Sequence, residues 1–119
     1  MIDFTDEREA LRDSVRRFLD DKQPMAEVRR LMETDDGHDP SVWAGLADLG
    51  VLGLDVPNRF GGSGSTFAEV AIVLEEMGRS LYCGPYFASL VLAAHALLLA
   101  DDLPLEPARH WTLERVLAC

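Results

Sequence analysis

The sequence predicts an all-α protein, folded as an up-and-down bundle of five or six helices. Apolar residues recur at spacings of three and four in successive stretches, which is typical of helices with one buried face. Capping residues or prolines stand before these stretches, as they do at the beginnings of helices. Outside Val51–Val56 we find no pattern typical of a β-strand. We therefore expect helices around a single core, because 119 residues are enough for one domain.

Three helices are expected in the first half of the chain. Thr5 can cap the first helix, whose apolar face consists of Ala10, Leu11, Val15, Phe18 and Leu19. The opposite face carries many Asp and Arg residues, and we expect it to be solvated. Pro24 suits the first position of a short second helix. Asp39 and Pro40 begin the third helix, which Gly50 ends.

An apolar run and a glycine-rich turn follow the third helix. The run, Val51–Val56, is predicted to be a buried extended segment. The turn, Gly61–Gly64, is called the glycine corner below. A dinucleotide-binding fingerprint would require a glycine where this chain has Phe67, and no Gly-Lys-Ser/Thr sequence is present. We therefore expect the glycines to allow a sharp turn and a close approach to a neighbouring segment, and not to hold a phosphate.

The fourth helix is predicted to begin with a capping box, in which Thr66 pairs with Glu69 three residues later. Its apolar stripe consists of Phe67, Val70, Leu74 and Met77. We expect Gly78 to end this helix, because glycine takes a positive φ without steric cost.

The fifth helix is expected to begin after Gly84-Pro85 and to run from Tyr86 to about Ala100. It is apolar on nearly every side, through Phe87, Leu90, Val91, Leu92, Leu97, Leu98 and Leu99. Such a helix is normally buried between partners. We therefore expect another domain or subunit to cover it, and the isolated chain to be marginally stable or to self-associate.

The titratable residues do not form a catalytic or metal-binding pattern. His38 and His110 lie in polar segments and are expected to be exposed. His95 lies within the apolar fifth helix, where a histidine is more often a hydrogen-bonded core residue than a general base. No metal-binding spacing links the three histidines. The sequence therefore predicts neither catalytic residues nor a metal site.

Two adjacent glutamates also lack the geometry of a catalytic pair. Glu75 and Glu76 point about 100° apart on a helix, so they cannot face one another. We expect both to lie on a solvated edge, with an ion pair between Glu75 and Arg79 four residues later.

Composition excludes several classes of partner. The net charge of −10 and a pI of about 4.5 oppose binding to nucleic acid or to anionic lipid. Cys83 and Cys119 have no CxxC spacing, which fits a reducing cytoplasm. The acidic N-terminus does not have the pattern of a secretory signal, and no stretch has the roughly 18 apolar residues of a membrane span. We expect a cytoplasmic protein.

The order of these elements resembles the N-terminal helical domain of acyl-CoA dehydrogenases. The resemblance rests on Trp43, Leu49-Gly50, Pro57 to Phe60, Gly61-Gly62-Ser63-Gly64 and Glu75-Glu76-Met77-Gly78-Arg79. It covers nearly the whole chain, from Phe4 to about Ala100. The family often has two acidic residues after the proline, where this chain has Asn58 and Arg59. We place the domain at residues 1–100. Residues 101–119 form a tail where the linker to a β-domain would begin, with a short helix expected from Leu105 to Leu117.

The resemblance implies a flavin-dependent oxidoreductase of lipid metabolism and fatty-acid β-oxidation. Such enzymes carry out α,β-dehydrogenation of an acyl-CoA thioester, with FAD as cofactor. The catalytic base and most of the flavin site belong to the C-terminal and middle domains of that family. This chain alone is therefore expected to be inactive and not to hold FAD. The family's N-terminal domain supplies one wall of the acyl pocket, which would correspond here to Pro85, Tyr86, Ser89 and Leu90.

Three functions remain open at this point. The chain can be the N-terminal domain, or a fragment, of such a dehydrogenase, joined by β- and C-terminal domains. It can be a small subunit that completes the pocket of a longer dehydrogenase chain in a homo- or hetero-oligomer. It can also be a stand-alone helical interaction module that binds another protein through its fifth helix. The length and type of the acyl chain (fatty, branched or steroid) and the electron acceptor are not predicted.

Overall fold

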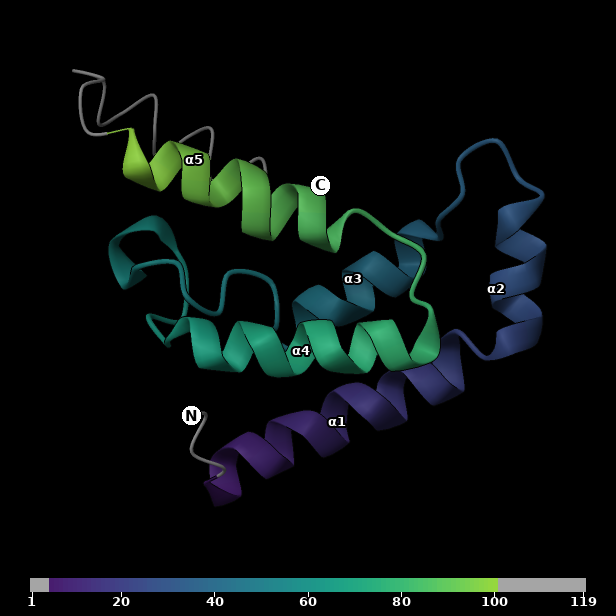
Figure 1. Cartoon of the computed structure of the whole chain (residues 1–119), viewed down its shortest axis with the longest axis horizontal. Coiled ribbons are helices and arrows are strands. Elements are labelled where there is room, and N and C mark those ends of the chain that lie inside the picture. Colours follow the sequence, from purple (N-terminus) through teal and green to yellow (C-terminus); the bar gives the residue numbers. More distant parts are fainter. Residues whose placement is uncertain (1–4, 101–119) are drawn as a thin grey trace.

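The computed structural model describes residues 5–100, and every regular element in that range is a helix (Figure 1). The elements are α1 (Asp6–Lys22), α2 (Met25–Met32), α3 (Pro40–Asp48), the 3₁₀ helix η1 (Asn58–Phe60), α4 (Phe67–Ser80), the π-helical segment η2 (Phe87–Ala93) and α5 (Ala94–Leu99). The predicted all-α bundle is thereby confirmed. The helix expected from Leu105 to Leu117 lies outside the described residues.

The helices pack in layers around one main core. Figure 1 shows α1 and α4 side by side, α3 and the last helix (η2 and α5) on the other side of α4, and α2 at one end. The buried residues of the main core are Val15, Leu19, Trp43, Leu46, Val51, Leu54, Val70, Val73, Met77, Tyr86 and Leu90. A smaller cluster of Val56, Phe60 and Ala94 lies between the loop before α4 and α5. The last helix therefore contributes to both clusters.

The predicted helix starts are confirmed at three positions. The Thr5 side chain accepts a hydrogen bond from the backbone N–H of Arg8, and the Asp39 carboxylate accepts one from the N–H of Ser41 at 2.8 Å. At α4 the capping box is present: the Glu69 carboxylate accepts from the Thr66 N–H at 2.9 Å and from its hydroxyl. The hydroxyl of Thr66 and the guanidinium of Arg8 lower the pKa of Glu69 to about 2.

The end of α4 is not where the sequence predicted it. The helix continues through Gly78 to Ser80, and Leu81 takes the left-handed conformation with φ of 53°. The backbone N–H of Tyr82 bonds to the Met77 carbonyl at 2.9 Å, so the last turn is closed as in glycine-ended helices. Leu81 takes this conformation at a steric cost that a glycine would not have, and its side chain is 57% exposed.

Because Gly78 lies inside the helix, we expect Gly78→Ala to stabilise the protein by about 0.5–1 kcal/mol. A Cβ there would meet nothing within 4 Å. Gly50 is the matched control, since it also has open space around it but its φ is +78°. Gly50→Ala should destabilise instead. Urea unfolding of both variants measures the two effects, and a destabilised Gly78→Ala would contradict the helical assignment.

The segment Val51–Val56 is buried, as expected, but it is not extended. It folds as a series of turns, with Gly53 at φ of +78°. The carbonyls of Gly53, Leu54 and Val56 accept hydrogen bonds from the N–H groups of Ser63, Ser65 and Gly64, at 3.0, 2.7 and 2.9 Å. The glycine corner therefore folds back over the turns and pairs with them, which a sequence pattern of apolar residues does not reveal.

Part of the polar face of α1 packs against α4, contrary to our expectation, while Asp13, Arg17 and Asp20 are exposed as expected. Glu76 is 1% exposed, and its carboxylate accepts from Arg12 at 3.1 Å, from Arg16 at 2.8 and 3.0 Å, and from Arg79 at 2.9 Å. We call these four residues the Glu76 cluster. Arg79 thus pairs with Glu76, three residues before it, and not with Glu75 as predicted.

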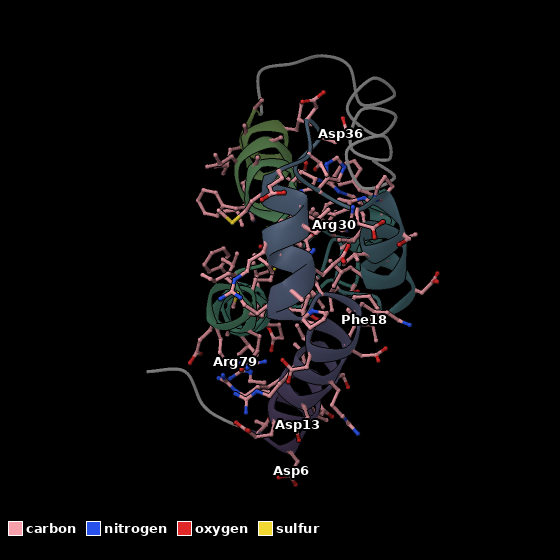
Figure 2. The ribbon with its side chains drawn as sticks, turned by 90° about the vertical axis from the view of Figure 1, so that its right-hand side faces the viewer. Asp6, Asp13, Phe18, Arg30, Asp36 and Arg79 are labelled. Atoms are coloured by element: carbon pink, nitrogen blue, oxygen red, sulfur yellow. The ribbon has the colours of Figure 1, made fainter. Side chains whose placement is uncertain are left out.

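Neighbouring ion pairs extend this contact along the two helices. Arg8 bonds to Glu69 at 2.9 Å, Arg12 also reaches Glu75 at 3.1 Å, and Arg79 donates to Asp20 at 2.8 Å. Figure 2 shows Arg79 in the space between α4 and α1. Arg8, Arg12 and Arg16 lie on the face of α1 that meets α4, so charge and not only apolar contact joins this pair of helices.

Within residues 5–100, no helix combines the length and apolar character needed to cross a membrane. In the same range, no three His, Cys, Asp or Glu side chains gather in a way that could hold a metal ion.

Candidate functional site

The predicted pocket wall lies at the start of the last helix. Gly84 and Pro85 form a bend after α4, and the backbone N–H of Ser89 bonds to the Pro85 carbonyl at 2.8 Å. The first half of the helix, Phe87–Ala93, is a π-helix and only Ala94–Leu99 is α-helical. We had expected one regular α-helix. A π-helix has more residues in each turn, so it changes which side chains share a face.

Tyr86 and Leu90 point into the main core, where they are 1% and 3% exposed. The Tyr86 hydroxyl donates to the Val51 carbonyl at 3.0 Å, and burial raises the pKa of this phenol. These two side chains are therefore covered within the chain and need no other domain or subunit to bury them. Pro85 and Ser89 are half-buried and lie closer to the surface. That the four residues line an acyl pocket stays a prediction.

The side of the last helix that stays uncovered is not the side that carries Tyr86 and Leu90. Phe87, Leu92 and Leu99 are 54%, 57% and 79% exposed, and we call them the open stripe. The step of five residues from Phe87 to Leu92 fits the π-helical segment. That the described residues leave an apolar side of this helix uncovered confirms one expectation from the sequence. Phe87 is not among the residues to which the resemblance points.

An apolar hollow of about 330 Å³ adjoins the open stripe. It is lined by the end of α4 and the start of the last helix, through Leu74, Met77, Gly78, Leu81, Tyr82, Gly84, Tyr86 and Phe87. Gly84 lets the Tyr82 ring lie against the backbone, since a Cβ there would be 2.1 Å from the Tyr82 hydroxyl. Burial raises the pKa of Tyr82, which therefore stays neutral. The described residues of this lining can hold an apolar group and include no cysteine, serine, histidine or carboxylate.

A second hollow lies in front of the same bend. Asp36, Gly37 and His38 line it together with Gly84 and Pro85, and its volume is about 310 Å³. His38 is half-buried and not exposed as expected, and its Nδ1 lies 3.1 Å from the Asp36 carbonyl. The loop before α3 thus forms one side of the entrance to the bend. His110 lies outside the described residues.

His95 is hydrogen-bonded, as the sequence predicted. Its Nε2 lies 2.6 Å from the Asp55 carboxylate and its Nδ1 lies 2.6 Å from the Val91 carbonyl. The side chain is 30% exposed, so it lies at the edge of the core.

The glycine corner has the features of a structural turn. Gly61 has φ of +86°, and a Cβ on Gly62 would lie 2.1 Å from the Val56 carbonyl oxygen. The backbone N–H groups of residues 61 to 65 all donate to carbonyls between Gly53 and Asn58. A phosphate loop needs N–H groups that are free to bind the anion. The donors of this turn are used within the chain, in agreement with the structural interpretation.

Comparison with known proteins identifies the family. A family model described as "Acyl-CoA dehydrogenase, N-terminal domain" matches residues 5–103. The chain belongs to the acyl-CoA dehydrogenase family. The match covers its N-terminal domain, which confirms the resemblance inferred from the glycine corner and the helices around it. Acyl-CoA dehydrogenases are oxidoreductases.

Relatives of this acyl-CoA dehydrogenase domain are much longer than the chain. It is 34% identical over 104 residues to acyl-CoA dehydrogenase IpdE2 of Mycolicibacterium smegmatis, covering 87% of the chain and 33% of that protein. The chain therefore spans about one third of the length of this curated relative. The fold also agrees with solved structures.

Two solved structures share the architecture of this acyl-CoA dehydrogenase domain. The ChsE4-ChsE5 complex from Mycobacterium tuberculosis matches with a TM-score of 0.73 and 31% identity, over 82% of this chain and 27% of that one. A variant of the Tcur3481-Tcur3483 steroid ACAD matches with a TM-score of 0.72 and 28% identity, over 87% of this chain and 29% of that one.

Proposed function

We propose that this chain acts as the N-terminal domain of a FAD-dependent acyl-CoA dehydrogenase and supplies one wall of its acyl pocket. The reaction is α,β-dehydrogenation of an acyl-CoA thioester. FAD supplies the redox chemistry, while protein residues bind and orient the substrate. The catalytic base and the flavin site belong to the β- and C-terminal domains, present either in the same chain or in a partner dehydrogenase chain.

The open stripe beside the apolar hollow carries this proposal. Three large apolar side chains lie exposed on one helix, next to a hollow of about 330 Å³ whose lining is mostly apolar. Apolar surface grouped in this way marks a place where another domain or an apolar ligand packs. The absence of cysteine, serine, histidine and carboxylate side chains from the described lining fits a domain that shapes a pocket and leaves the chemistry to its partners.

The four predicted wall residues divide into two kinds in this proposal. Pro85 and Ser89 are half-buried and reach the acyl chain from the start of the helix. Tyr86 and Leu90 are part of the core and hold the same turn in place from behind. Phe87, which lies on both the open stripe and the hollow, joins the wall as a further contact.

Ser89→Leu is the sharpest test of the wall. In the complete enzyme, the larger side chain should shift kcat/KM between a steroid-side-chain CoA thioester and a straight-chain one by about tenfold, because each methylene in an apolar pocket is worth about 1–3 kcal/mol. The steroid substrate is included because one solved relative is described as a steroid ACAD. Leu90→Ala is less suitable, because truncating a core residue costs about 2–5 kcal/mol of stability.

Ser89→Ala is the matched control and should leave the substrate ratio nearly unchanged, since it adds no volume. The flavin absorption spectrum should be the same in both variants, because these residues are not expected to touch the ring. Equal loss of activity toward all substrates would contradict the wall assignment and would indicate core packing. A changed flavin spectrum would do the same.

The expectation that this chain alone does not retain FAD belongs to the same proposal. Mixing the 119-residue chain with excess FAD and desalting it should leave no visible flavin absorption. Stoichiometric retention would place the flavin site in this domain and would contradict the division of roles proposed above.

A small-subunit function is the second candidate, and one observation favours it. The solved relative ChsE4-ChsE5 is a complex of two named chains. In that case the open stripe would pack against a longer dehydrogenase chain in a hetero-oligomer. Co-purification with a longer dehydrogenase would distinguish this function from self-association or from an unrelated interaction module. Replacing Phe87 and Leu92 by Ser should abolish it.

A further inference from the structure

His95 joins the last helix to the turns of Val51–Val56 through a polar contact at the edge of the core. Its Nε2 lies 2.6 Å from the Asp55 carboxylate, and its Nδ1 lies 2.6 Å from the carbonyl of Val91 one turn earlier. The Asp55 side chain is 12% exposed and the His95 side chain is 30% exposed, so the contact is partly shielded from water.

The chemistry of the two neighbours determines the protonation state that this geometry requires. A carbonyl oxygen and an ionised carboxylate both accept hydrogen bonds and donate none. A neutral imidazole has one N–H and can satisfy only one of them. The other ring nitrogen would then present a lone pair to an acceptor at 2.6 Å, which is repulsive. An imidazolium ring has two N–H groups and satisfies both acceptors.

We propose that His95 is a proton-dependent clasp, which holds the last helix against the segment Val51–Val56 when its ring is protonated and releases the Asp55 bond when the proton leaves. The small apolar cluster is what the clasp closes over: Ala94 packs on Val56 and Phe60 directly beside it, with Leu97 and Leu98 at its margin. His95 is thus a positioning residue for the helix that carries the open stripe.

Among the described residues, Arg59 is a charged group near this contact, since its guanidinium lies 4.6 Å from the centroid of the Phe60 ring in the small apolar cluster. The charged group that the turns of Val51–Val56 place at this contact is Asp55. From α4 the neighbour is the Phe67 ring, at 6.0 Å between centroids and edge-on, which does not titrate. At the start of the last helix lies Tyr86, and both burial and the negative charge of Asp55 raise the pKa of its phenol. Among these neighbours, His95 is therefore the group that changes charge near neutral pH.

The direction of the pH dependence follows from the neighbours of the ring. Burial lowers the pKa of His95, but the Val91 carbonyl and the Asp55 carboxylate outweigh it, so the pKa lies above its usual 6.5. A group whose pKa is raised by folding stabilises the protein fully below its unfolded-state pKa. That contribution is lost as the pH rises through the raised value. The clasp is therefore expected to open as the pH rises through the raised pKa of His95.

Two measurements on the 119-residue chain test the clasp, and neither needs flavin or substrate. The first is an NMR titration of the histidine rings, with His95→Gln and His38→Gln used to assign signals. The His95 pKa should lie above 6.5 and should fall when Asp55 is replaced by Asn. Asn is the matched change, since it keeps the size and an acceptor but removes the charge.

The second measurement is the stability coupling between His95 and Asp55, from a double-mutant cycle with His95→Gln and Asp55→Asn. The coupling should be about fivefold in the unfolding equilibrium constant about one pH unit below the His95 pKa found in the titration, and close to onefold about two units above it. Amide protection at Ala96 to Leu99, corrected for the intrinsic rise of exchange with pH, should fall over the same interval in the wild type but not in His95→Gln.

Two results would overturn the proposal. One is a His95 pKa that does not respond to Asp55→Asn. The other is a coupling of equal size at both pH values, which would show an ordinary structural hydrogen bond. If a variant fails to fold, the titration and the amide exchange of the wild-type chain alone decide the question.

Discussion

Glu76→Gln is expected to lower the free energy of unfolding by about 3 kcal/mol, among the largest effects of a single substitution in this chain. Glutamine has nearly the same shape, so packing is kept while the charge is lost. The carboxylate is 1% exposed and accepts from Arg12, Arg16 and Arg79. Removing it leaves three guanidinium groups close together without their shared partner, and Arg12 is itself only 12% exposed.

Glu75→Gln is the matched control for this prediction. Glu75 is the adjacent residue, carries the same charge and also pairs with Arg12, but its side chain is 66% exposed. Exposed ion pairs contribute about 0–1 kcal/mol, so Glu75→Gln should cost less than about 1 kcal/mol. Urea unfolding at neutral pH compares the two. Equal costs would show that burial does not determine the strength of the Glu76 cluster.

The pH dependence gives a second check on Glu76. The guanidinium of Arg16 is the largest cause that lowers the pKa of Glu76, from 4.5 to about 2, while burial opposes it. A carboxylate with a lowered pKa contributes stability that is present above its unfolded-state pKa and is lost as the pH falls through the folded-state value. The stability difference between wild type and Glu76→Gln should therefore shrink between about pH 4.5 and about pH 2.

Gly62→Ala is the second substitution with a large expected effect, a destabilisation of about 3 kcal/mol. A Cβ at this position would lie 2.1 Å from the Val56 carbonyl oxygen and 2.6 Å from the carbonyl carbon. Both are backbone atoms and cannot move away as a flexible side chain would. The turns of Val51–Val56 or the glycine corner must shift, and the hydrogen bonds between them are lost with that shift.

A substitution at Gly61 tests the effect of backbone conformation in the same turn without the steric contact found at Gly62. Its φ is +86°, but a Cβ would meet nothing within 4 Å. Gly61→Ala should therefore cost only about 1–2 kcal/mol, and Gly61→Asn less, because asparagine tolerates this conformation. Thermal or urea unfolding of the three variants measures the order. If alanine at both positions left stability unchanged but removed binding of inorganic phosphate, the corner would be a binding loop.

Much of the fold follows from local signals in the sequence. The caps at Thr5, Asp39 and Thr66 involve residues at most three positions apart, so the spacing of residue types is enough to predict them. The shape of Val51–Val56 is different, because it depends on hydrogen bonds with residues about ten positions later. The apolar composition of this segment correctly predicts that it is buried, but it does not predict its hydrogen bonds to the glycine corner.

The candidate site was harder to predict for two physical reasons. Two of the residues to which the resemblance points, Tyr86 and Leu90, are buried in the core, while Phe87 in the π-helical stretch Phe87–Ala93 is exposed. Sequence spacing also does not predict which glutamate pairs with Arg79, because Glu75 and Glu76 are both close enough on the helix. The arginines of α1, some 60 positions away in sequence, make Glu76 the buried partner.

The Glu76 cluster also has a consequence for the order in which the chain folds. The hydrogen bonds that join Arg12 and Arg16 to Glu76 connect residues 64 and 60 positions apart. During synthesis, α1 leaves the ribosome first, but its carboxylate partners are made only with α4. Closing so long a loop is slow compared with forming a helix. Although α1 is made before α4, its arginines are therefore expected to gain their buried carboxylate partner only when α4 has been made and docks.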